Sequence, residues 1–162
     1  MLHQSSKVED RSEDLDPSKA VLKNVIASKH SIINYEFMAF SSGAVGCVFK
    51  FIDNSNFYLF EIGGSYNISK RFFTLRKKIN GIWSTIKSFT NALSVKDVPF
   101  FGYEMNIWYT VKIEINNNSI EIYTAINDAT ALTKIMSVTD NQILSGRVGF
   151  TSTSTDEKAI NS

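Results

Sequence analysis

From Val21 onward, apolar and polar residues alternate in short runs along the chain. In IWYTVKIEI (107–115) every odd-numbered residue is apolar or aromatic, while the even-numbered ones are Trp108, Thr110, Lys112 and Glu114. Successive side chains of a strand point to opposite faces of a sheet, so this pattern predicts a half-buried strand. The stretch IINYEFMAF (32–40) repeats the pattern.

Turn signals separate these runs. NNNS (116–119) lies between IWYTVKIEI and IEIYTAI, and the Asn-Gly of NGIW (80–83) lies between RFFTLRKK and WSTIKSF. Asparagine and glycine adopt left-handed backbone conformations readily, so both stretches predict β-hairpins. Only DNQIL (140–144) indicates a helical turn. About ten short strands joined by turns predict an all-β antiparallel sandwich or barrel.

The composition supports one folded domain behind a charged leader. The chain has 162 residues, of which 43% are hydrophobic and 12% aromatic, enough to form a substantial core. Residues 1–20 carry many charges of both signs. We therefore expect an N-terminal arm or linker over 1–20 and a single β-sandwich domain over 21–162.

Charge and hydropathy exclude several classes of function. The net charge of +1 argues against a basic nucleic-acid-binding surface over the whole domain. No apolar run approaches the length of a membrane span, and the first residues lack the apolar core of a signal peptide. The single cysteine, Cys47, lies in an apolar run, so we expect a buried thiol and no internal disulfide.

The order of the motifs resembles a known family. GAVGCVFKFIDNSNFYLFEI is followed by NGIW, then WYTVKIEINNNSIEIY, then VTDNQILSGRVGFTS. This order is similar to that of concanavalin A-like, laminin G-type jelly rolls. It is closest to the branch that contains fructan-binding modules and the domain associated with keto-disaccharide hydrolases. The resemblance covers roughly residues 21–153, with Lys50 where that branch often has arginine.

The resemblance implies a specific architecture. It implies an all-β, antiparallel two-sheet jelly-roll sandwich with one convex and one concave sheet. Ligands of such domains often lie on the concave face or at the loop rim. One sandwich fold hosts many activities, so the function has to be argued from side chains.

The sequence gives little support to an enzyme. A glycosidase needs two converging carboxylates, and the E-x-D-x-E strand motif of the sandwich-type glucanases is absent. We expect Glu36, Glu61, Glu114 and Glu121 to be isolated on four strands. Both histidines, His3 and His30, lie near the N-terminus, which argues against a catalytic triad. A hydrolase acting on a modified disaccharide therefore rests on family analogy alone.

The polar segment DNSN (53–56), which lies between two apolar runs, is open to two interpretations. Asp53, Asn54 and Ser55 supply oxygens of the type that calcium prefers, and Asp140 could add another if the two turns meet. The same residues are ordinary turn formers. We expect no required cofactor, and leave open a structural calcium ion held by Asp53, Asn54 and Asp140.

Sugar sites combine an aromatic platform with planar polar groups. The candidates for stacking are Tyr58, Trp83 and Trp108, with Tyr103 as a further one. The candidates for hydrogen bonding are Lys50, Glu61 and Arg76. We expect a concave face that holds Lys50, Glu61 and Arg76 beside an exposed aromatic ring.

Five cations gather in SKRFFTLRKK (69–78). Arg76 and Lys78 share one strand parity, and Lys77 shares the other with Leu75. Lysines often protect an edge strand against pairing with another molecule, and we favour this explanation. The alternative is a strand that receives an acidic or sulfated glycan.

The sequence favours a non-catalytic, lectin-like carbohydrate-binding module within a larger secreted or surface protein. Its expected partner is a glycan or glycoprotein, with an acidic glycan as one alternative. A protein-interaction or adhesion domain that binds a protein partner is the second hypothesis. The glycosylation sequons at Asn67 and Asn117 favour an extracellular or cell-surface location. We expect no nucleic-acid partner and no membrane span.

Overall fold

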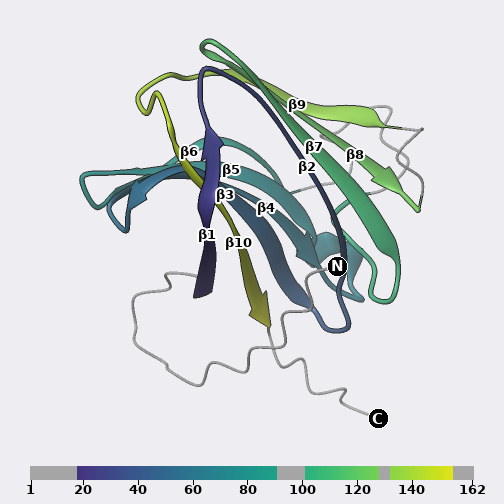
Figure 1. Cartoon of the computed structure of the whole chain (residues 1–162). Helices are drawn as coiled ribbons and strands as arrows, with labels where there is room; N and C mark the ends of the chain where they lie inside the picture. Colours follow the sequence, from purple (N-terminus) through teal and green to yellow (C-terminus); the bar gives the residue numbers. More distant parts are fainter. Residues whose placement is uncertain (1–17, 91–100, 128–131, 155–162) are drawn as a thin grey trace.

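A computed structural model describes residues 18–90, 101–127 and 132–154 of the chain. The chain forms two stacked antiparallel β-sheets, as the sequence predicts (Figure 1). The only helical segment in the described part is a single 3-10 turn, Ile68–Lys70. Within these residues no helix is long and apolar enough to cross a membrane.

One sheet has six strands and the other has four. The six-stranded sheet has the order β1 (Ser18–Ala27), β10 (Gly146–Ser154), β3 (Gly43–Asp53), β4 (Asn56–Gly64), β5 (Phe72–Ile79) and β6 (Ile82–Phe89). The four-stranded sheet has the order β2 (His30–Met38), β7 (Trp108–Asn116), β8 (Ser119–Ile126) and β9 (Thr133–Thr139). The first strand begins three residues before the expected start of the domain at residue 21.

Both predicted hairpins are confirmed. Asn80 and Gly81 connect β5 to β6 with φ angles of 51° and 79°, the left-handed values that a tight two-residue hairpin turn requires. Asn117, with φ 54°, lies in the turn between β7 and β8. Asparagine and glycine therefore stand where a bulkier residue would be strained.

The predicted helical turn over residues 140–144 is wrong. This segment is the irregular connection between β9 and β10. The Gln142 N–H donates to the carboxylate of Asp140 (3.2 Å), and the Ile143 N–H donates to the hydroxyl of Tyr58 (3.3 Å). Because side chains accept hydrogen bonds from these backbone N–H groups, the segment does not need a helix to satisfy them.

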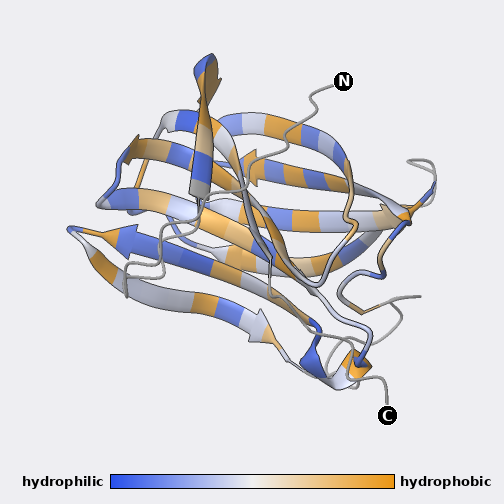
Figure 2. Cartoon of the chain, turned by 90° about the horizontal axis from the view of Figure 1, so that it is seen from below, coloured by the Kyte–Doolittle hydropathy of each residue, from blue (hydrophilic) through white to orange (hydrophobic). Residues whose placement is uncertain are grey.

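The core lies between the two sheets. Figure 2 shows apolar and polar residues alternating along most strands, as expected for sheets with one covered face. The six-stranded sheet contributes mainly Cys47, Phe49, Phe60, Ile62, Phe73 and Leu75, and the four-stranded sheet Ile33, Phe37, Val111, Ile113 and Ile122. Cys47 is fully buried, as predicted, and burial raises the pKa of its thiol.

The six-stranded sheet is strongly curled. In a flat sheet β1 and β4 would be about 14 Å apart, because two strands lie between them and neighbouring strands are about 4.8 Å apart. The Lys19 ammonium on β1 nevertheless lies 4.2 Å from the centre of the Phe57 ring on β4. Gly149 permits this approach, since a Cβ there would lie 2.5 Å from the Ala20 carbonyl oxygen. The outer face of this sheet is therefore its concave face.

Replacing Leu75, which is fully buried in the core, with alanine should lower the free energy of unfolding by about 3 kcal/mol. The matched control is Leu144→Ala, because Leu144 is 69% exposed and its loss should change stability by less than about 0.5 kcal/mol. Urea denaturation measures both values. Equal losses in the two variants would contradict this placement of the core.

Candidate functional site: the curled face

The outer face of the six-stranded sheet carries side chains that alternate with those of the core. We call it the curled face, and it is formed by Lys19, Val48, Phe51, Phe57, Leu59, Glu61, Arg76, Lys78, Trp83 and Arg147. The strand register aligns these residues in rows across β10, β3, β4, β5 and β6.

An apolar floor underlies the curled face. Val48, Phe51, Phe57 and Leu59 form a buried cluster separate from the main core, and Val21 and Trp83 pack against it. The Trp83 ring meets the Phe57 ring edge to face, with centroids 5.3 Å apart and an interplanar angle of 89°. This geometry is favourable for aromatic pairs.

Four cationic side chains lie over the rings of this floor. The Lys19 ammonium is 4.2 Å from the Phe57 centroid, and the Arg147 guanidinium is 5.3 Å from that of Phe51. Arg76 and Lys78 lie 4.4 Å and 5.4 Å from the Trp83 centroid. Cations attract the electron-rich faces of aromatic rings, so these contacts hold the charged groups at the surface of an apolar layer.

One carboxylate completes the group. Glu61 on β4 is only 6% exposed, and its Oε2 accepts a hydrogen bond of 2.7 Å from Arg76 Nη2 on β5. The two residues are diagonal neighbours across the strands, because Arg76 lies directly opposite Leu59, two residues before Glu61. Arg76 Nε is buried and has no hydrogen-bond acceptor in the described part of the chain. Glu61, Arg76 and Trp83, three of the candidates that the sequence offers, thus come together, and their role in ligand binding stays a prediction.

The expectation that Lys50 shares this face is wrong. Lys50 has a left-handed φ of 50°, and the register of β3 against β4 shifts between Phe49 and Asp53. Against β10, β3 has one extra residue between Val48 and Phe51, and this bulge reverses the side on which Lys50 points. Lys50 is 1% exposed and lies near the Tyr58 ring, toward the interior between the sheets.

Tyr58 also points to the interior side, into a polar cluster at the end of the sandwich. Its hydroxyl and the Lys77 ammonium donate to the two carboxylate oxygens of Asp140. Burial opposes ionisation of Asp140, but the hydrogen bonds from Lys77 and Tyr58 hold its pKa below the usual value. Burial lowers the pKa of Lys50, against the attraction of Asp140. Through Asp140, the cluster binds the β9–β10 connection to Tyr58 of β4 and Lys77 of β5.

The calcium interpretation stays a prediction. Asp53 Oδ1 accepts hydrogen bonds from the Ser55 N–H (2.7 Å) and the Asn56 amide (3.0 Å), as in an ordinary turn around Asn54. Asp140 uses its oxygens for Tyr58 and Lys77. In residues 18–90, 101–127 and 132–154, no group of three histidine, cysteine, aspartate or glutamate side chains could hold a metal ion.

The other aromatic candidates lie elsewhere. Trp108 belongs to β7 in the four-stranded sheet, where it is 41% exposed on the far side of the molecule from the curled face. Tyr103 is buried, and its hydroxyl donates to the Ser41 carbonyl (2.9 Å). Of the sugar-stacking candidates, only Trp83 contributes to the curled face.

The structure differs from two expectations about charged residues on the strands. Glu114 and Glu121 are not isolated, because they are register partners on β7 and β8, each bonded to a lysine. The cationic strand β5 is not at an edge, since β4 and β6 flank it. Edge protection therefore does not explain Arg76 and Lys78.

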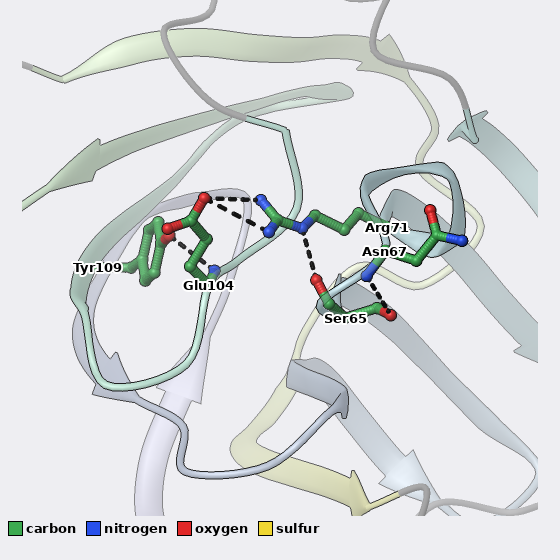
Figure 3. A network of polar contacts seen from close by, with 5 residues as sticks. All are labelled: Ser65, Asn67, Arg71, Glu104 and Tyr109. Carbon is green, nitrogen blue, oxygen red and sulfur yellow. Dashed lines mark hydrogen bonds and ion pairs between the residues drawn. The ribbon is translucent and has the colours of Figure 1, made fainter. Parts of the chain in front are cut away.

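A second polar network joins the two layers where β4 ends (Figure 3). Arg71 donates through Nε to the Ser65 carbonyl (2.8 Å) and through both terminal nitrogens to Glu104 Oε1 (3.3 and 3.4 Å). The Glu104 N–H donates to the Tyr109 hydroxyl (2.9 Å). The network links the β4–β5 connection to the segment before β7 and has a structural role.

Sequence reasoning missed Lys19 and Arg147. Lys19 falls within the expected N-terminal arm, because the domain is predicted to start only at residue 21. Arg147 lies in SGRVGF, which the sequence marks as a fold signature alone. Arg147 and Gly149 are two residues apart on the last strand and therefore share the face opposite to Val148. This spacing is the signal that could have placed Arg147 on an outer face.

Comparisons with known structures support the fold. Over 83% of this chain, the carbohydrate binding module CBM66 from Bacillus subtilis aligns with a TM-score of 0.58, 16% identity and 73% of its own length. A toad ovary galectin in complex with thio-digalactose aligns over 83% of this chain and 88% of its own, with a TM-score of 0.52 and 14% identity. The GH43 protein BlXynB from Bacillus licheniformis aligns over 76% of this chain, with a TM-score of 0.50 and 11% identity.

These likenesses show a concanavalin A-like jelly-roll fold, which confirms the predicted fold class. The chain spans about a quarter (24%) of the length of BlXynB, and no statement about that whole protein transfers. No protein-family model matches the chain, and no curated protein matches its sequence. The narrower resemblance to the fructan-binding branch stays a prediction.

The Asp140 cluster predicts an acid-dependent loss of stability. Because the folded-state pKa of Asp140 is lowered, its ionised form stabilises the fold above the unfolded-state pKa of about 3.9, and this contribution is lost as the pH falls below that value. Asp140→Asn should lower the free energy of unfolding by about 2 kcal/mol at pH 7 and by clearly less near pH 3.

Urea denaturation at the two pH values provides the measurement. Asp53→Asn is the matched control, because Asp53 is exposed in a turn and should change stability by less than about 0.5 kcal/mol. If Asp140→Asn lowers the free energy of unfolding by the same amount at both pH values, the charge of the carboxylate contributes nothing to stability.

Proposed function

We propose that this chain is a carbohydrate-binding module and that the curled face is its binding surface. The observation that carries the proposal is the contact group of Glu61, Arg76 and Trp83 on a concave sheet. It combines an indole ring with a planar hydrogen-bonding pair, which are the two elements that sugar recognition needs.

The structural neighbours support the same class of ligand. One of them is a carbohydrate binding module, and another forms a complex with thio-digalactose. Their identities of 16% and 14% are too low to transfer binding residues, so the proposal depends on the side chains of this chain. The extracellular or cell-surface setting belongs to the proposal and is supported by the two sequons alone.

A protein-interaction domain is the second candidate. A groove lined by Leu22, Val25, Ile26, Ile32 and Phe150 exposes apolar side chains beside β1 and β2. Exposed apolar patches of this kind often mark protein contacts. The hydrolase hypothesis has family analogy as its only support.

Trp83→Ala should weaken the binding of an oligosaccharide ligand at least about tenfold, because it removes the ring that supports Arg76 and Lys78. The ligand is first found by screening the full chain against an array of neutral and acidic glycans. Calorimetric titration then measures the affinity of each variant.

The chain offers a matched control in its second tryptophan. Trp108→Ala removes an indole of similar size from the other sheet and should leave the affinity unchanged. Equal losses from the two substitutions would argue against the curled face. Binding to no glycan on the array at saturating protein concentration would refute the proposed function and leave the protein-interaction candidate.

A further inference from the structure

We infer that two neighbouring hydroxyl groups of a saccharide bind above Gly46, between the hydroxyl of Thr151 and the carboxylate of Glu61. This inference rests on the proposed function and specifies which part of a sugar the six-stranded sheet recognises. It follows from the position of one glycine and from the hydrogen-bonding groups beside it.

A row of small and polar residues crosses the outer face of the six-stranded sheet. We call it the polar row, and strand pairing aligns its members in the order Thr151 on β10, Gly46 on β3, Glu61 on β4, Thr74 on β5 and Ser88 on β6. The apolar floor lies beside it, since Val48 follows Gly46 and Leu59 precedes Glu61 by two residues on the same face. Sugars combine apolar C–H faces with hydroxyl groups, and this surface offers a partner to each.

Gly46 allows two polar side chains from non-adjacent strands to converge. A Cβ at this position would lie 2.6 Å from Thr151 Oγ1 and 3.0 Å from Glu61 Cγ, so both side chains reach over the glycine, from β10 and from β4. Gly46 lies directly opposite Thr151 and Glu61 in regular pairing, so no bulge accounts for it. Glycine inside a regular strand often marks a place where a ligand approaches the backbone closely.

Two glycines of β4 provide a comparison. The Phe72 ring fills the space above Gly63 and the Tyr103 ring that above Gly64, at 2.2 Å and 2.1 Å from the position of a Cβ. Packing of an aromatic ring therefore explains both of these glycines. At Gly46 the two nearest side chains are polar, and aromatic packing offers no such explanation.

Both polar groups above Gly46 retain hydrogen-bonding capacity. Thr151 is only 4% exposed, and its hydroxyl has no hydrogen-bond partner among the described residues. Glu61 Oε2 accepts from Arg76, whereas Glu61 Oε1 accepts no hydrogen bond from the described part of the chain. Farther along the polar row the hydroxyls of Thr74 and Ser88 bond to each other (3.0 Å), so the free capacity lies on the Gly46 side.

A saccharide diol matches this pair of groups. One sugar hydroxyl can donate to Glu61 Oε1 while its neighbour exchanges a hydrogen bond with Thr151 Oγ1, because a hydroxyl both donates and accepts. Hydrogen bonds from hydroxyl groups to a carboxylate are short and strong. The bond from Arg76 holds the Glu61 carboxylate in position before a ligand arrives. A buried hydroxyl that gains a partner on binding also recovers the free energy that its unpaired state costs.

NMR titration of the full chain tests this site with small saccharides. The probes are the methyl glycosides of glucose, galactose, mannose and fructose. We expect at least one to bind with a dissociation constant of about 1–10 mM and to shift the amide signals of Gly46 and Thr151. Monodeoxy derivatives of that glycoside then identify the bonded groups. Removal of either of two neighbouring hydroxyls should weaken binding about fivefold, and removal of the others should have little effect.

Thr151→Val removes the protein hydroxyl and keeps nearly the same side-chain shape. It should weaken binding of the parent glycoside about fivefold, and loss of the bonded sugar hydroxyl should cause no further loss in this variant, because the two groups bond to each other. Thr153→Val is the matched control. Thr153 is exposed on the same face, two residues further along β10, and its substitution should leave the affinity unchanged.

Gly46→Ala provides an independent variant. Its methyl group would force Thr151 and Glu61 apart, so we expect binding to weaken about tenfold. Thermal unfolding establishes whether each variant is folded. The milder Thr151→Val keeps the test decisive where Gly46→Ala does not fold.

Three outcomes would overturn the inference. If none of the four glycosides shifts Gly46 and Thr151, no saccharide diol binds there, while binding on the glycan array and its loss in Trp83→Ala would still support the proposed function. Equal effects of Thr151→Val and Thr153→Val would place the contact elsewhere on the molecule. Binding neither to these glycosides nor to the array would refute the proposed function, and this inference with it.

Discussion

The strand β4 is buried on both of its faces, and the rest of the molecule is arranged around this constraint. Tyr58, Phe60 and Ile62 point toward the four-stranded sheet, while Phe57 and Leu59 point the other way. Burying one such side chain contributes about 1.5–3 kcal/mol, so exposing the second face would be costly. No strand of the four-stranded sheet covers that face, and the six-stranded sheet shields it by curling on itself.

The curl makes a surface suited to binding. It brings Lys19 and Val21 of β1 over the floor, while Trp83 covers it from β6. The aliphatic stems of long cations shield apolar surface while their charged ends stay in contact with water. Rings beneath the cations restrict their movement, which lowers the entropic cost of ordering them around a ligand. Under the proposed function, stability and ligand recognition therefore depend on the same side chains.

Much of the fold follows from the sequence, because strand alternation and Asn-Gly turns are local signals. The position of Trp83 opposite Lys78 also follows, once NGIW is recognised as a hairpin, whereas the approach of Arg76 to Glu61 depends on the pairing of β5 with β4. The side on which Lys50 points could not be predicted. Its left-handed backbone conformation shifts the in–out alternation of β3, and the local sequence pattern gives no sign of this. Lys19 and Phe57 meet only through the curl of a whole sheet, which alternation cannot predict. Likewise, the interior position of β5 depends on strand order, which only the tertiary structure supplies.

The central claim is that a glycan binds on the concave side of the six-stranded sheet. Backbone-amide NMR of the full chain during titration with an oligosaccharide identified on the glycan array tests it most directly. We predict that the largest shift changes occur in β4, β5 and β6 around Glu61, Arg76 and Trp83. Changes confined to the four-stranded sheet, or to the β3–β4 turn and the β9–β10 connection, would contradict it.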